Sequence, residues 1–104
     1  MDSVFRALSD PTRRRVLQLL RKRPMTAGEL ADEFDLSRPT MSGHFAVLRA
    51  ADLIAAERHG TTITYSLRLS VLQDALLEFA EVFGVGEVKA NLGARLGNES
   101  AHAS

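Results

Sequence analysis

The sequence predicts a mainly helical domain that carries one small β-hairpin. Three observations indicate this class. Amphipathic segments with helix-capping residues fill most of the chain up to about residue 83, two short strand-like runs flank a glycine turn, and a broad apolar helix follows them. The length of 104 residues is at the lower end for one domain. We therefore expect one domain over residues 1–84 and a flexible C-terminal extension over residues 85–104.

Two helices are expected at the start of the chain. The first carries Val4, Phe5 and Leu8 on one stripe, because residues three to four apart share a helix face. The second begins at Asp10-Pro11. An aspartate there can accept hydrogen bonds from the first backbone N–H groups, and proline suits the first helical position.

The next two predicted helices are short and closely spaced. Thr26 to Glu29 fits a capping box, so a helix should start there and run to about residue 34. A tight connection follows over residues 35–37, and Ser37 caps a further helix over about 38–50. Its buried stripe would contain Met41, Phe45 and Leu48. Two short helices joined by a three-residue turn indicate a helix-turn-helix.

A hairpin and a final helix complete the pattern. Residues 53–58 and 63–67 can form strands around a turn at 59–62, and a last helix should begin at Ser70 with a second capping-box-like run. The order of four helices, hairpin and helix is that of a winged helix-turn-helix, whose terminal helices are free to pair across a dimer. The dimer interface is expected to contain Phe5, Leu8, Leu72, Leu76 and Phe79.

The charge is balanced overall but segregated along the chain. Thirteen basic and thirteen acidic residues give a formal net charge of zero, which argues weakly against a nucleic-acid binder. However, residues 1–23 hold seven basic and two acidic groups, a charge of plus five, whereas residues 24–36 hold four acidic groups alone. Such segregation favours one basic face.

The helix expected over residues 38–50 can read DNA, because an α-helix fits the major groove. Arg38 near its start can pair with guanine O6 and N7, and Pro39 offers an apolar contact to a thymine methyl. Hydroxyl groups can bond phosphates or base edges. The residues predicted to contact DNA from this helix are Ser37, Arg38, Pro39, Thr40, Ser42, Gly43 and His44.

Several of these residues also have a plainer interpretation. Capping alone would explain Ser37, and Arg38 would then be a solvated first-turn residue, although the helix dipole disfavours a cation there. Gly43 either lets the backbone approach DNA closely or is a tolerated helix glycine. His44 either contacts a phosphate or packs at the helix edge.

Basic residues elsewhere give weaker signals. Arg58 and His59 flank the predicted wing tip, where they would lie over a minor groove or its phosphates, and an ordinary solvated hairpin is the alternative. The runs at 13–15 and 21–23 could touch DNA, but solubility and helix-end electrostatics explain them better.

Other classes of protein find little support. The absence of cysteine excludes a disulfide, a thiolate nucleophile and a thiolate metal ligand. The carboxylates between residues 29 and 35 lack an accompanying nucleophile, which favours a solvated helix face over an enzyme active site. No apolar run is long enough to cross a bilayer, and the first residues do not resemble a signal peptide. We expect a cytoplasmic protein that is not an enzyme and has no membrane partner.

Two runs of the sequence carry a family resemblance: Val-Phe-Arg-Ala-Leu-Ser-Asp-Pro-Thr-Arg over residues 4–13 and Ser-Arg-Pro-Thr-Met-Ser-Gly-His-Phe-Ala-Val-Leu over residues 37–48. Both resemble the ArsR family of bacterial winged-helix repressors. The resemblance extends over residues 4–83. Residues 25–31, 65–67 and 71–74 are similar to the metal-independent subgroup typified by the sporulation-delay autorepressor. This resemblance implies a homodimer that binds a palindromic operator in double-stranded DNA and blocks transcription, often of its own operon.

The chain departs from the metal-sensing members of that family. Their Cys-x-Cys pair corresponds here to Thr26 and Gly28, and their last-helix Asp and His ligands are replaced by Asp74, Glu78 and Glu81 without a histidine. A borderline-soft metal would lack thiolate and imidazole partners. We therefore expect no metal and no cofactor.

These observations bear on three functions from different classes. A dimeric DNA-binding repressor fits the predicted recognition helix and wing. A winged-helix module for protein interaction without specific DNA binding is the alternative that the neutral net charge permits. A small hydrolase is the third, and no catalytic constellation supports it.

Overall fold

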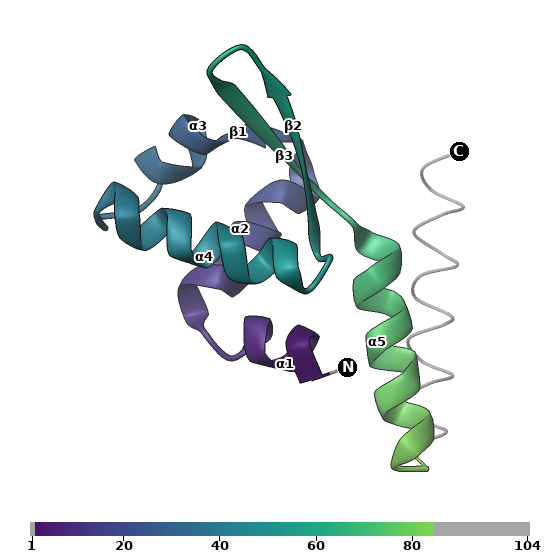
Figure 1. The fold of residues 1–104 in the computed structure, drawn as a ribbon. Helices are drawn as coiled ribbons and strands as arrows, with labels where there is room; N and C mark the ends of the chain where they lie inside the picture. Colours follow the sequence, from purple (N-terminus) through teal and green to yellow (C-terminus); the bar gives the residue numbers. More distant parts are fainter. Residues whose placement is uncertain (1, 85–104) are drawn as a thin grey trace. The chain divides into compact units, whose positions relative to one another are not determined.

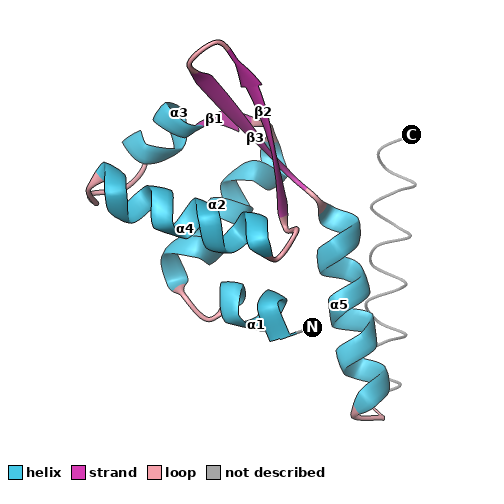
Figure 2. Ribbon diagram, viewed as in Figure 1, coloured by secondary structure: helices cyan, strands magenta, loops and turns pink. Residues whose placement is uncertain are grey.

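The computed structural model describes residues 2–84, in which five helices accompany a three-stranded antiparallel sheet (Figures 1 and 2). The elements in chain order are α1 (Asp2–Leu8), α2 (Pro11–Lys22), β1 (Met25–Thr26), α3 (Ala27–Asp32), α4 (Arg38–Ala50), β2 (Ile54–His59), β3 (Thr62–Leu67) and α5 (Leu69–Val82). The chain divides into two compact units, residues 1–72 and 73–104. The predicted winged helix-turn-helix is confirmed, with α3 and α4 as its two helices.

Local capping positions the helices as the sequence predicts. The Asp10 carboxylate accepts a hydrogen bond from the Arg13 backbone N–H at 3.1 Å, and α2 begins at Pro11. The predicted capping box is complete, because Thr26 Oγ1 accepts from the Glu29 N–H at 3.0 Å while Glu29 Oε1 accepts from the Thr26 N–H at 2.9 Å. Ser37 caps α4.

Two helix boundaries differ from the expectation. Helix α3 ends at Asp32 and not near residue 34, because the backbone N–H groups of Glu33 and Phe34 bond carbonyl groups only three residues back and tighten the last turn. The connection to α4 therefore takes residues 33–37. Helix α5 begins at Leu69, so Ser70 lies inside its first turn and does not cap it.

The sheet contains one strand that the sequence did not predict. Strand β1 has two residues, and it pairs antiparallel with β3, which lies between β1 and β2. The wing hairpin has the expected strands but a shorter turn, formed by Gly60 and Thr61 alone. A positive φ of 64° at Gly60, the first of the two loop residues, suits glycine there.

The core of residues 2–72 is formed by apolar side chains. The predicted stripe of α4, Met41, Phe45 and Leu48, is buried, and the ring centroids of Phe45 and Tyr65 in β3 are 4.8 Å apart. No buried side-chain nitrogen or oxygen of the described residues lacks a hydrogen-bond partner. The recognition helix therefore packs on the wing through an aromatic pair.

Helix α5 is apolar along much of its length. It carries Ala75 and Ala80 as buried residues, and the rings of Phe79 and Phe83 are 4.7 Å apart. The predicted extension over residues 85–104 lies outside the described residues. None of the helices within residues 2–84 is both long enough and apolar enough to cross a membrane.

Candidate nucleic-acid interface

The first turn of α4 is an exposed, hydroxyl-rich surface. Ser37 Oγ accepts from the Thr40 N–H at 3.3 Å and donates to Thr40 Oγ1 at 2.8 Å. Both functions of the Ser37 hydroxyl are therefore used within the cap, which gives that residue a structural role. The Thr40 hydroxyl accepts this bond and keeps its own hydrogen for an acceptor outside the protein.

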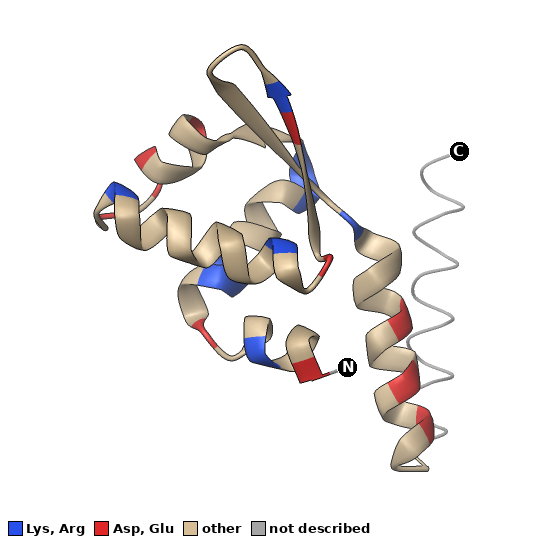
Figure 3. Cartoon of the chain, viewed as in Figure 1, with Lys and Arg blue, Asp and Glu red and all other residues tan. Residues whose placement is uncertain are grey.

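The remaining predicted contacts of this helix face solvent. Arg38, Pro39, Ser42 and Gly43 are all exposed, and the Arg38 side chain makes no hydrogen bond or ion pair to another described residue. Figure 3 shows basic positions at the start of α4 and near the end of β2, and acidic positions on α3 and α5. Apart from its chain neighbours and the backbone of its own helix, no atom of the described residues would lie within 4 Å of a Cβ added at Gly43. The structure thus gives no internal packing reason for this glycine.

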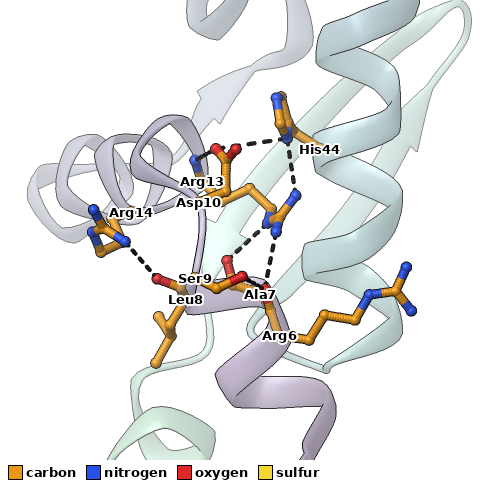
Figure 4. A network of polar contacts seen from close by, with 8 residues as sticks. All are labelled: Arg6, Ala7, Leu8, Ser9, Asp10, Arg13, Arg14 and His44. Atoms are coloured by element: carbon orange, nitrogen blue, oxygen red, sulfur yellow. Dashed lines mark hydrogen bonds and ion pairs between the residues drawn. The ribbon is translucent and has the colours of Figure 1, made fainter.

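His44 lies differently from its neighbours. Its side chain is only 15% exposed, and its Nδ1 is 3.2 Å from Nη1 of Arg13 and 4.0 Å from Oδ1 of Asp10 (Figure 4). His44 therefore packs at the helix edge against the start of α2, as one of the two sequence interpretations has it.

Arg13 and Arg14 have a role that sequence reasoning missed. The last carbonyl groups of a helix have no partner within it. Arg13 Nε donates to the Ala7 carbonyl at 2.8 Å, and Arg14 Nη1 donates to the Leu8 carbonyl at 2.8 Å. Two features of the sequence could have indicated this role. Only two residues separate α1 from α2, and basic residues follow directly, so their donors lie beside the unpaired carbonyl groups at the end of α1.

Strand register separates the two predicted wing residues. Arg58 lies opposite Ile63 and His59 opposite Thr62, and opposed residues share a face while neighbours alternate. Arg58 is therefore on the same face as Tyr65, which packs on α4. His59 lies on the other face, where its Nε2 is 3.2 Å from Glu57 Oε1, and both side chains are well exposed.

The predicted dimer residues lie on two helices. On α1, Phe5 and Leu8 are partly exposed, and on α5 Leu72 and Leu76 are partly exposed. Phe79 is 41% exposed and, by spacing, follows the other two along one side of α5. Val82 and Phe83 are 65% and 67% exposed. Each helix thus presents apolar surface.

The positions that the resemblance aligns with metal ligands have other roles or face solvent. Thr26 is committed to the capping box, Gly28 has no side chain, and Asp74, Glu78 and Glu81 are exposed on α5. Within residues 2–84, no three histidine or carboxylate side chains gather in a geometry suited to a metal ion. The pKa of Glu29 is lowered by its bond from the Thr26 N–H and then by Arg23, whose Nη1 lies 3.2 Å away.

Comparisons with known proteins agree with this architecture. A helix-turn-helix domain model matches residues 8–57. The transcriptional repressor SdpR of Bacillus subtilis (strain 168) is 47% identical over 76 residues, a match that spans 73% of this chain and 84% of that repressor. The HTH-type transcriptional regulator KmtR of Mycobacterium tuberculosis is 47% identical over 64 residues, 62% of this chain and 49% of that regulator.

Solved structures show the same relationship. The crystal structure of an ArsR family transcriptional regulator superposes with a TM-score of 0.75 at 31% identity, and the match covers 83% of this chain and 94% of that protein. An ArsR-like transcriptional regulator from Rhodococcus sp. RHA1 gives a TM-score of 0.70 at 31% identity over 89% of this chain and 86% of its own. These relatives are named as regulators and not as enzymes. The chain therefore belongs to the ArsR family of helix-turn-helix transcriptional regulators.

Proposed function

We propose that this regulator binds a palindromic operator as a homodimer and represses transcription, including transcription of its own gene. The observation that carries the proposal is the exposed start of α4, where Arg38 has no partner among the described residues and stands beside Thr40 and Ser42. Unpaired donors at the N-terminal end of a recognition helix are suited to base edges. The repressor name of the Bacillus relative supports the direction of regulation.

Each element would contribute a different kind of contact. Arg38 would form two hydrogen bonds to a guanine, Pro39 would touch a thymine methyl, and the hydroxyl groups of Thr40 and Ser42 would bond phosphates or base edges. Arg58 on the wing would hold a phosphate, which adds affinity without reading sequence. Repression follows because the occupied operator excludes the transcription machinery.

Dimerisation is proposed through the apolar surfaces of α1 and α5, with Phe5, Leu8, Leu72, Leu76 and Phe79 as its centre. Exposed apolar surface of this kind supports an isologous interface. Two recognition helices about 34 Å apart would then reach successive major grooves. We propose further that the protein acts in the cytoplasm without a metal, because neither metal position of its relatives carries a thiolate or imidazole here.

Selection of duplexes from a randomised pool tests the proposal. The full chain should enrich a palindromic sequence, and light scattering of the complex should give two protein chains per duplex. Affinity for the selected duplex should exceed that for a scrambled one by roughly 10³-fold or more at physiological salt. Weak binding without sequence preference, abolished by salt, would instead indicate a winged-helix module for protein interaction.

A further inference from the structure

One guanidinium group joins three helices in this protein. Arg13 belongs to the first turn of α2, and its Nε and Nη2 donate to the carbonyl groups of Ala7 at 2.8 Å and Arg6 at 2.9 Å, at the end of α1. Its third contact goes from Nη1 to Nδ1 of His44 in α4, at 3.2 Å (Figure 4). The end of α1 and the middle of the recognition helix are therefore held by the same side chain.

The chemistry of this contact gives it a direction. An arginine side chain stays protonated and can only donate, so Nδ1 of His44 is the acceptor. The histidine side chain is 15% exposed and the nearby Asp10 side chain 32%, so water competes only partly for the bond. A charged donor in a partly buried site makes a stronger hydrogen bond than a neutral pair on the surface.

We propose that His44 is a positioning residue, which fixes the recognition helix for base reading through its Nδ1 bond to Arg13 and not by contacting DNA. This inference rests on the proposed function. His44 follows Ser42 by two residues and Arg38 by six, so a shift of α4 at His44 moves both side chains relative to the rest of the fold. Bidentate base contacts tolerate such a shift poorly, whereas phosphate contacts do not depend on sequence.

Two substitutions at His44 separate positioning from a direct phosphate contact. The amide oxygen of asparagine lies about where Nδ1 does, so His44→Asn keeps the acceptor for Arg13 and removes the outer edge of the ring. Glutamine places its amide near the Nε2 position, so His44→Gln keeps an outer donor and loses the inner acceptor. Melting curves of both variants check that each is folded.

Arg13 and Arg14 provide a matched pair on the other side of the contact. Both cap the end of α1, but only Arg13 reaches α4. Arg14→Gln should therefore lower the melting temperature with little change in sequence preference, whereas Arg13→Gln should lower both. If Arg13→Gln does not fold, the two His44 variants still decide the question.

The readout is binding by fluorescence anisotropy to the duplex selected by the wild type and to a scrambled duplex. His44→Asn should stay within about twofold of wild type on the selected duplex, and His44→Gln should lose about five- to tenfold there while it keeps its affinity for the scrambled duplex. The double variant Arg13→Gln/His44→Gln should lose no more than the larger single loss.

The opposite order, with His44→Gln intact and His44→Asn weakened, would overturn the inference in favour of a phosphate contact. Equal preference in wild type and both variants would overturn it as well. A wild type that itself fails to distinguish the two duplexes would refute the proposed function, and that result is recognised before any variant is compared.

Discussion

Arg38 is the first residue of α4, and its guanidinium has no partner within the described part of the protein. A cation at a helix N-terminus is opposed by the helix dipole, so helix stability does not explain an arginine at this position. We expect Arg38→Ala to cost roughly 1 to 3 kcal/mol of operator affinity and to relax preference at one base pair. Binding to a set of single-base operator variants measures both effects, and unchanged preference would remove Arg38 from the base-reading residues.

A second prediction for a single residue concerns Gly43 in the middle of α4. No side chain or distant backbone within residues 2–84 would meet an added Cβ, so Gly43→Ala should raise the free energy of unfolding by about 1 kcal/mol. Gly28→Ala is a matched control in α3, where the new Cβ would lie 3.9 Å from Thr26 Oγ1, an ordinary contact. Denaturant melts measure stability in both variants. If operator affinity falls in Gly43→Ala but not in Gly28→Ala, the backbone at Gly43 approaches DNA closely. If it is unchanged in both, Gly43 is a tolerated helix glycine.

Single residues were predictable where the reason for them is local. The caps at Asp10, Thr26 and Ser37 depend on neighbours three residues away, and all three are present as expected. The partner of His44 is 31 positions distant, so only the packing of α2 on α4 identifies it. For the same reason, the sequence left the role of His44 open between two interpretations.

Among the elements, the wing offers a comparison of two adjacent basic residues. Arg58 and His59 lie on opposite faces of the hairpin, and His59 has Glu57 beside it. Arg58→Ala should weaken binding to all duplexes alike and reduce the slope of log affinity against log salt by about one. His59→Ala should leave that slope unchanged. Salt titrations of the three proteins check this, and equal slopes would show that neither residue holds a phosphate.

The N-terminus of α2 should make stability depend on pH. The pKa of Asp10 is lowered chiefly by the hydrogen bond that its carboxylate accepts from the Arg13 backbone N–H, with smaller contributions from the Thr12 N–H and the Arg13 guanidinium, while partial burial opposes the shift. A carboxyl group whose pKa is lowered by folding stabilises the protein above its ordinary value of 3.8 and loses this contribution as the pH falls through the lowered value.

The Asp10→Asn variant isolates this effect, because asparagine caps helices well but does not titrate in this range. The wild type should be the more stable protein near pH 6, and the difference should shrink as the pH falls below about 4. Urea unfolding across this range measures it. The pKa of Glu29 is also lowered, but Glu29 is present in both proteins, so its contribution cancels in the stability difference between them. A difference that does not vary with pH would contradict the electrostatic account.

Element boundaries show where sequence patterns lose resolution. The buried stripe of α4 repeats with helical spacing and was predicted correctly, whereas the end of α3 depends on two hydrogen bonds that tighten its last turn. Strand β1 has only two residues, too few for an alternating pattern, and it exists because β3 offers it a free edge. No local signal in Met25 and Thr26 distinguishes a strand from a loop.

At the scale of the whole molecule, the proposed dimer depends on the apolar side of α5. Leu76 is partly exposed and lies between Leu72 and Phe79 along one side of α5, so Leu76→Glu would bury a charge in the interface. We expect this variant to be monomeric and to lose operator binding, because both recognition helices must bind together. Glu78→Gln changes an exposed residue of the same helix and should remain dimeric. Sedimentation measures both, and a Leu76→Glu variant that is still a dimer would refute this interface.

Strand β1 also has a consequence for how the chain folds. Met25 pairs with Tyr65, 40 positions later, and the chain between them contains α3, α4 and β2. Closing a loop of that length costs conformational entropy, which is repaid only once the intervening helices are packed, whereas the wing hairpin closes across two residues. The hairpin can therefore form early and locally, but its third strand joins late. The two-residue strand thus completes the sheet only in a molecule whose helix-turn-helix is already assembled.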